Sequence, residues 1–526
     1  MKRSKNVKRS NHKRLSIFKI KQNSLKKSNR KSNRKSKKQM LDGNRLYDNI
    51  TPISGKISRV NQKISLHGVS YNTNQNMVLE EMFYENENIP SEELLDNTNQ
   101  NMAFEEMLYE NEKMLKVQNN PFKYKLTRHS KMIFSEFDKM LLYNSQTENT
   151  KNIFKDFYNK FREADEFVSH IDIEKHLYKI EKIENHKKIP KTDDFTYIIP
   201  EIRENINDMA EHIIIYKFPS LFERNIEIYF TVNKLDINEI NGFVYKMLLW
   251  LFVVTKLNNK PSCSRKLEIY IYLTDLIKCL PKNKQKIGKI SINTGFTTSC
   301  SSESNITIYR REEWFKVFIH ESIHNLGLDF SGMNNQNTKN RILKIFPVKS
   351  LVKAYESYTD TFARILNVLM CSYLMSPQKT FNTYIENVEK LINVERTYAY
   401  FQVVKILSHM GLIYEDLYEF GREDKRKLYS EETSILSYYI IGLILLSDYE
   451  KFLSWCQENN NKHSILQFDN VSEKQEKFCD YVENEYKNSK FLKTIKEMEF
   501  IFNNMENNKT YILNNVRKSF CEFEIE

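Results

Sequence analysis

Two histidines and a glutamate stand at metal-binding spacing in one short segment. His320 and His324 are at positions i and i+4, and Glu321 directly follows the first histidine. On a helix these histidines share one face about a turn apart, so both imidazoles can reach one Zn²⁺ at roughly 2.0–2.1 Å. Glu321 can then take the proton from a zinc-bound water. The pattern predicts a hydrolytic zinc site, with two structural histidines on an amphipathic helix as the alternative.

A catalytic zinc needs a third protein ligand, and two downstream patterns compete for it. In the pattern HExxHxxGxxH of the metzincins, Gly327 fits but the ligand position holds Phe330, which cannot bind zinc. Asp329 is one residue out of register. The other candidate is Glu356, which shares a predicted helix face with Asp360 at i+4. This second pattern supplies Glu356 as a zinc ligand and Asp360 as a neighbouring carboxylate on the same helix face.

HExxH followed by ExxxD on a second helix resembles the signature of the gluzincins, the thermolysin-like zinc metallopeptidases. The resemblance covers residues 305–370. It implies that the zinc ligands are His320, His324 and Glu356, and that Glu321 is the general base. It also implies that Asp360 accepts a hydrogen bond from an imidazole N–H, most simply that of His320, and so holds the ligating tautomer.

Gluzincins also stabilise the oxyanion with a downstream histidine or tyrosine, but no local sequence pattern identifies that residue in this chain. Tyr398, Tyr400 and His409 are available on a predicted helix around 395–410. No local pattern chooses among them, and packing is the alternative role for each. Without such a residue the chain could bind zinc and lack turnover.

Helices and strands around the motif predict an α+β fold. Apolar spacing and a C-terminal Gly327 indicate a buried helix over 313–327, and a second helix runs from about Ser350 to Met375. Strand-like runs precede them: Ile226–Val232, Leu267–Leu273, Lys289–Phe296 and Ile306–Tyr309. An edge strand over 289–298 is the candidate for binding an extended peptide through main-chain hydrogen bonds.

The domain prediction follows composition. A disordered basic tail spans 1–66, a polar linker with a 25-residue duplication spans 67–119, and a helical region spans 120–199. A zincin-like catalytic domain, in which a small sheet carries the HExxH helix and the glutamate helix, spans 200–375. A helical C-terminal domain spans 376–526. The duplication repeats Asn72–Met77 as Asn97–Met102, and a tolerant linker is its simplest interpretation.

The net charge of +12 is a property of the tail. Residues 1–40 contain 17 Lys and Arg and no acid, so the remaining residues carry 12 − 17 = −5. Such a segment cannot bury enough apolar area to fold and can bind nucleic acid or another polyanion. A solvated tail without a partner is the alternative.

Several features indicate an intracellular enzyme. The apolar stretch near the start, 15–20, is too short for a secretory signal, and seven cysteines without a CxxC pair predict reduced thiols. The apolar stretches 244–254 and 435–446 are shorter than a membrane helix, so we expect no membrane partner. Abundant Lys, Asn and Ile are typical of an A+T-rich genome, such as that of a giant DNA virus or a protozoan, and place the protein in the host cytoplasm, nucleus or virion if it is viral.

The sequence therefore predicts a zinc metallopeptidase that hydrolyses peptide bonds in a peptide or protein substrate. It lacks GxSxG, GxxxxGK and GxGxxG, which disfavours serine-hydrolase and nucleotide chemistry. One alternative is an inactive zincin-fold structural or virion-associated protein whose basic tail binds nucleic acid. Another is an effector-like peptidase with a single host substrate.

Overall fold

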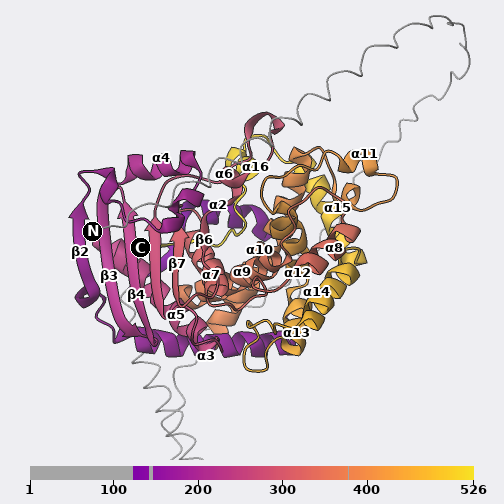
Figure 1. The fold of residues 1–526 in the computed structure, drawn as a ribbon. Coiled ribbons are helices and arrows are strands. Elements are labelled where there is room, and N and C mark those ends of the chain that lie inside the picture. Colours follow the sequence, from indigo (N-terminus) through magenta and orange to yellow (C-terminus); the bar gives the residue numbers. More distant parts are fainter. Residues whose placement is uncertain (1–121, 141–145, 377) are drawn as a thin grey trace, which may run out of the picture. The chain divides into compact units, whose positions relative to one another are not determined.

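The first half of the described chain contains a six-stranded mixed sheet, whose strands lie between residues 177 and 308 (Figure 1). The computed structural model describes residues 122–140, 146–376 and 378–526. The strand order is β2-β3-β4-β5-β7-β6, in which β4, β5 and β7 run parallel and the other neighbours are antiparallel. Their bounds are β2 (Leu177–Lys182), β3 (His212–Leu221), β4 (Arg224–Val232), β5 (Lys266–Tyr272), β6 (Gly295–Thr297) and β7 (Glu303–Ile308).

Helices make up most of the remainder, so the fold is mixed α+β as the sequence predicts. They are α2 (Arg128–Phe137), α3 (Glu148–Ser169), α4 (Pro200–Met209), α5 (Ile237–Lys256), α6 (Lys289–Ile292), α7 (Trp314–Asn325), α8 (Gln336–Ile345), α9 (Ala354–Met375), α10 (Phe381–His409), α11 (Glu423–Arg426), α12 (Gly442–Ser447), α13 (Tyr449–Asn459), α14 (Ser472–Glu485), α15 (Ser489–Asn503) and α16 (Thr510–Asn514). Short 3₁₀ turns include η5 (Asp193–Tyr197), and η8 (Leu436–Ile441) is a π-helical stretch.

The two faces of the sheet pack against different helices. Along β5, Ile269 and Ile271 belong to the main core, which also contains the apolar residues of α5 and α7. Tyr270 and Tyr272 alternate with them and join a smaller cluster with α4 and η5. This alternation is the period of two that strand geometry imposes, and it gives the sheet one face toward α7 and one toward α4.

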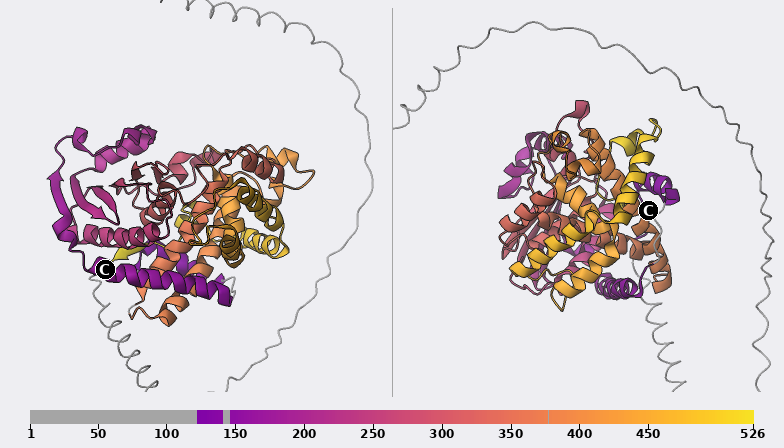
Figure 2. Two further views of the ribbon diagram at one scale, coloured as in Figure 1. Left: turned by 60° about the horizontal axis from the view of Figure 1, so that its bottom comes forward. Right: turned by 90° about the vertical axis from the view of Figure 1, so that its right-hand side faces the viewer.

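The C-terminal helices continue the same core rather than forming a separate cluster. The buried apolar side chains of the C-terminal helices belong to the same connected group as those of α5 and α7. A second, two-stranded sheet joins the two ends of the described chain, because β1 (Tyr124–Leu126) pairs with β8 (Phe523–Ile525). Figure 2 shows the C-terminus beside the early helices. The predicted boundaries at 200 and 375 remain predictions, and the predicted tail and duplicated linker lie outside the described residues.

Three of the four predicted strands are confirmed, and the fourth needs correction. The runs at 226–232, 267–273 and 306–309 correspond to β4, β5 and β7. The run predicted over 289–298 is wrong in its first half, because Lys289–Ile292 is a short helix and only Gly295–Thr297 is a strand. Alternation over so few residues does not separate a helical turn from a strand.

The prediction that all cysteines are reduced is also wrong. Cys263 and Cys300 form a disulfide, with Cα atoms 4.6 Å apart, and the five other cysteines are free thiols. The bond joins the loop after α5 to the turn between β6 and β7. Counting cysteines does not reveal which two the fold brings together.

Helix α5 has the length and composition of a membrane-spanning helix, and 83% of its most apolar window is buried inside the protein. Its apolar side chains pack against the sheet and against α3 and α7. Burial on all sides of the helix accounts for its continuous apolar sequence.

Candidate metal centre and cleft

Helix α7 positions the two histidines in the interior of the protein. All of its residues from Trp314 to Asn325 are buried, and the Trp250 indole donates a 2.6 Å hydrogen bond to Ser322 Oγ from α5. The helix ends where Gly327 takes a φ of +64°, a left-handed conformation that a residue without Cβ adopts without strain. The buried helix predicted over 313–327, with Gly327 at its C-terminal end, is confirmed as α7 (Trp314–Asn325).

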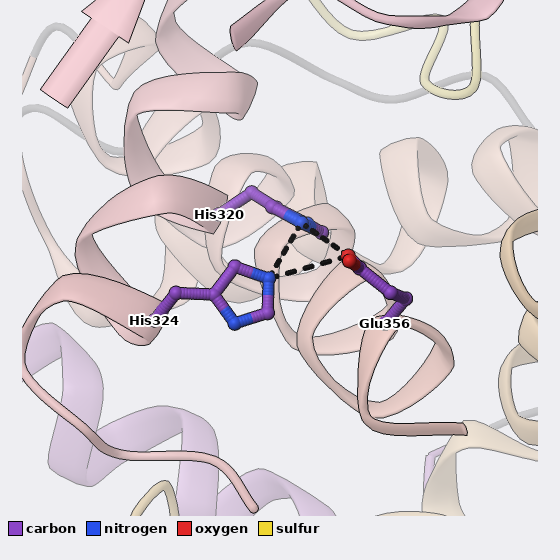
Figure 3. A group of neighbouring side chains, drawn as sticks. All are labelled: His320, His324 and Glu356. Atoms are coloured by element: carbon purple, nitrogen blue, oxygen red, sulfur yellow. Dashed lines mark hydrogen bonds and ion pairs between the residues drawn. The ribbon is translucent and has the colours of Figure 1, made fainter. Parts of the chain in front are cut away.

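Three donor atoms converge between α7 and α9. His320 Nε2 and His324 Nε2 are 3.1 Å apart, and each lies 3.2 Å from Glu356 Oε2 (Figure 3). All three side chains are buried, and among the described residues they form the group of histidine, cysteine and acidic side chains that could hold a metal ion. The structure thus brings together the three ligands that the sequence proposes.

Each histidine has a carboxylate beside its other ring nitrogen. His324 Nδ1 is 2.7 Å from Asp329 Oδ2, and His320 Nδ1 is 3.5 Å from Asp360 Oδ1. The hydrogen bond to Asp329 fixes the tautomer in which His324 Nε2 is free to bind a metal, whereas the 3.5 Å contact of His320 Nδ1 is not a hydrogen bond. The sequence proposed Asp360 for this position. From the sequence, Asp329 was considered only as a zinc ligand that is one residue out of register. An acid two residues after Gly327 was the signal for its contact with His324.

Two lysines compensate the buried charge of Asp360. Lys316 from α7 forms an ion pair with its Oδ1, and Lys518 from the C-terminal segment lies 3.4 Å from the same atom. Burial alone would raise the pKa of Asp360, but the two ammonium groups hold it well below its usual range. The carboxylate is therefore ionised and can accept the imidazole N–H.

Glu321 faces a cleft of about 300 Å³ that opens over the three donors. Burial raises the pKa of its carboxyl group above the ordinary value, while the neighbouring histidines oppose the shift. The cleft is lined by Asn293, Gly295, Phe296, Thr297, Ser299, His320, Glu321, His324, Ser331, Lys353, Tyr355, Glu356 and Tyr438. A carboxylate with a raised pKa beside a candidate metal site is suited to accept a proton from water.

Tyr438 lines the cleft and was not among the oxyanion candidates proposed from sequence. Its ring centroid is 6.2 Å from that of His320, and Lys518 Nζ lies 3.4 Å from the tyrosine ring centroid. Burial raises its pKa well above the ordinary value, and Glu356 and Glu321 raise it further, so the hydroxyl stays protonated and can donate a hydrogen bond. Tyr438 lies in π-helical η8, and a π turn changes which side chains share a face. The apolar run around it looks like an ordinary core helix.

The three oxyanion candidates proposed from sequence do not line the cleft. Tyr398 is buried and its hydroxyl accepts a hydrogen bond from Gln402, while the ring of Tyr400 packs 5.6 Å from that of Phe491. His409 is half-buried, and its Nε2 lies 3.0 Å from the carbonyl oxygen of Gln285. All three lie on α10, whose buried face packs into the helical core.

Strand β6 forms one wall of the cleft and is the last strand of its sheet. The main-chain N–H of Thr298 donates to the carbonyl oxygen of Asn305 at 3.4 Å, and the carbonyl oxygen of Thr294 accepts from the N–H of Tyr309 at 2.9 Å. Because bonded residues alternate in an antiparallel pair, the N–H and C=O groups of Gly295 and Thr297 point away from β7. Asn325, at the end of α7, donates to Thr297 Oγ1 at 3.0 Å and so ties this edge to the motif helix.

No protein-family model, curated protein or solved structure matches the chain. The geometry of the cleft is therefore the basis for assigning a function.

Proposed function

We propose that the chain is a zinc metallopeptidase with a zincin-type core related in its site to the gluzincins. The observation that carries this proposal is the convergence of His320, His324 and Glu356 in a cleft that also contains Glu321 and a free strand edge. Each part corresponds to a step of peptide hydrolysis.

The donor set fits zinc. Tetrahedral coordination at about 2.1 Å places neighbouring donor atoms roughly 3.4 Å apart. The three distances here are 3.1, 3.2 and 3.2 Å, so small movements suffice to seat the ion. Two imidazoles and one carboxylate are a set known from catalytic zinc sites, which leave a fourth position for water or substrate. The two imidazoles and the carboxylate also present several hydrogen-bond acceptors to one another, and hydrogen bonds among the three groups alone satisfy these acceptors poorly.

The residues of the cleft divide the chemistry among them. Bound zinc would polarise the scissile carbonyl and lower the pKa of a water molecule toward about 7. Glu321 accepts the proton from the attacking water and delivers it to the leaving amine nitrogen. Tyr438 lines the same cleft, and its protonated hydroxyl would donate a hydrogen bond to the oxyanion as negative charge develops there.

Strand β6 supplies the means to bind a peptide. The outward main-chain groups of Gly295 and Thr297 can pair with an extended substrate, which adds a strand to the sheet. Such pairing recognises the backbone of any peptide and lays it along the cleft wall. It thereby brings a substrate carbonyl toward the position between the metal donors and Glu321.

The first test is the zinc content of the full chain after reconstitution, measured by mass spectrometry. We expect about one zinc per wild-type chain and a large loss in Glu356→Ala, since a third ligand is removed. Glu386→Ala, on the exposed surface of α10, is the matched control. A folded wild-type protein that takes up no zinc contradicts the proposal.

The second test separates metal binding from turnover on a synthetic peptide pool. Glu321→Gln should keep its zinc and lose cleavage, because the amide cannot accept the proton. His324→Ala should lose both. Retained cleavage in either variant contradicts the mechanism, and zinc binding without cleavage by the wild type favours an inactive zincin-fold protein.

A further inference from the structure

We propose that a second hollow beside β6 is a specificity pocket that takes a large apolar or aromatic side chain of the substrate. This inference rests on the proposed peptidase function and names the class of peptide that the cleft selects. The hollow has a volume of about 230 Å³. It is lined by Asp194, Tyr197, Ile199, Ile202, Lys289, Asn293, Gly295, Phe296, Thr297 and Tyr309.

The hollow and the metal cleft lie on either side of the same strand. Both are lined by Asn293 and by Gly295, Phe296 and Thr297 of β6. The remaining walls of the metal cleft include α7 and α9, whereas those of the hollow include η5, α4 and the end of β7. Because α7 and α4 pack on opposite faces of the sheet, β6 separates the two spaces.

Strand geometry connects the hollow to the substrate. A peptide that pairs with the free edge of β6 continues the sheet, so its side chains alternate between the two faces. If one residue faces the metal cleft, its neighbours face the α4 side. The hollow therefore receives a side chain within two positions of the scissile bond.

The chemistry of the walls determines which side chain fits. The rings of Tyr197 and Phe296 stand edge to face, with centroids 6.4 Å apart and planes at 80°. Ile199 and Ile202 add aliphatic surface from the start of α4. Aromatic and aliphatic walls of this kind favour a large apolar side chain, whose burial removes about 150–250 Å² of surface from water when it is aromatic.

The charged groups at the hollow do not favour a charged substrate. Asp194 and Lys289 carry opposite charges and belong to different elements, so neither sign dominates. Tyr197 is 72% exposed although it borders this hollow, whose lining combines aromatic and aliphatic side chains with polar ones. An exposed aromatic ring of this kind gains contact area when a substrate side chain covers it.

The test uses the full-length chain loaded with zinc and a synthetic peptide pool randomised over its central positions. Wild-type protein reports cleavage sites, and Glu321→Gln reports captured peptides by mass spectrometry without turnover. We expect Phe, Tyr, Leu or Met to be enriched at one position within two residues of the cleaved bond. The same residues should be enriched among the captured peptides.

Two variants address the pocket, each made in both backgrounds. Tyr197→Ala removes an exposed wall and should reduce the apolar preference about tenfold or more. Ile199→Asp places a carboxylate at the wall, and Asp is a favourable residue at this N-cap of α4, so folding is preserved. Tyr178→Ala is the control, because Tyr178 is a 65% exposed tyrosine on β2, at the opposite edge of the sheet.

The outcomes separate the pocket from the peptidase. Loss of the preference in both pocket variants, with zinc content and the Tyr178→Ala preference unchanged, supports the inference. Capture or cleavage without an apolar preference overturns the pocket and leaves the peptidase standing, as does a preference that both variants retain. Selective capture without wild-type cleavage overturns the peptidase and keeps the pocket. If no peptide is captured or cleaved by zinc-loaded protein, both are overturned.

Discussion

At the scale of single residues, the site depends on which groups hold protons. In the metal-free protein, burial lowers the pKa of His324, but the carboxylates of Asp329 and Glu356 outweigh it and raise the pKa well above 6.5. A proton and a metal ion compete for the same ring nitrogen. Asp329, which lies beside Nδ1 of this histidine, and Glu356, which lies beside its Nε2, therefore both strengthen the competition of a proton with the metal.

We expect zinc affinity to fall by about tenfold for each pH unit once the pH drops below the raised pKa of His324, because one proton must be displaced. The sign follows from the direction of the shift: a raised pKa moves the onset of weakening to a pH above the ordinary histidine value. A competition titration against a zinc chelator from pH 8 to pH 6 measures it. Asp329→Asn should move the onset to lower pH, and an affinity that does not change across this range contradicts the assignment.

The hydroxyl of Tyr438 offers a second test at this scale. Tyr438→Phe should keep zinc and lower kcat by about 10²–10³, the loss typical when one oxyanion donor is removed. Tyr400→Phe is the matched control, because that ring packs against Phe491 away from the cleft. Steady-state kinetics on a cleaved peptide decide the matter, and an equal loss in the two variants rejects the role of Tyr438.

At the scale of elements, the contact between β6 and α7 sets the width of the cleft. A Cβ added to Gly295 would lie 2.8 Å from the carbonyl oxygen of Thr307 and 3.0 Å from Val317 Cγ1. It would also lie 3.4 Å from Glu321 Cγ. Glycine at this position lets β6, the proposed peptide-binding strand, approach α7, which carries the proposed general base Glu321.

Gly295→Ala should therefore lower stability by about 1–3 kcal/mol through overpacking, and it should reduce turnover more than zinc binding. The backbone of β6 must move away from the Thr307 carbonyl of β7 and from Val317 of α7, which would shift a bound substrate relative to Glu321. Gly332→Ala is the control, because a Cβ there meets nothing within 4 Å. Denaturant unfolding and peptide cleavage measure the two effects, and wild-type values for both in Gly295→Ala would rule out the tight contact.

At the scale of the whole molecule, the C-terminal segment links the metal site to distant parts of the chain. Lys518 approaches Asp360 on α9, and the main-chain N–H of Ser519 donates to Glu313 at the start of α7 at 2.7 Å. Glu313 also pairs with buried Lys278 at 2.6 Å, and the neighbouring charges lower its pKa to about 2 against the effect of burial. The last residues of the chain thus help to position both helices of the site.

The ion cluster at Asp360 predicts a global effect. Asp360→Asn leaves the ammonium groups of Lys316 and Lys518 buried without their carboxylate, so we expect a loss of about 3–5 kcal/mol of folding stability together with weaker zinc binding. Asp424→Asn is the control, because Asp424 is an exposed acid paired with a lysine on the surface. Denaturant unfolding of the metal-free proteins measures the difference, and equal stabilities would show that the cluster contributes little.

The sequence alone determined the parts that depend on local spacing. The helical period of 3.6 residues places His320 and His324 on one face, and the same argument pairs Glu356 with Asp360. The helices at 313–327 and up to Met375, and three of the strands, follow from apolar periodicity that burial requires. These features need no knowledge of which distant segments meet.

Only the tertiary structure decided which distant residues surround the metal donors. Tyr438 lines the cleft from a π-helical stretch. Asp329 approaches His324 from beyond Gly327, and Lys518 approaches Asp360 from the segment that precedes β8. The disulfide and the short edge strand likewise depend on contacts between segments far apart in sequence. Such contacts are set by the packing of whole helices and strands against one another. The free energy of this packing is shared over many residues, so no local residue spacing in the sequence reveals the contacts.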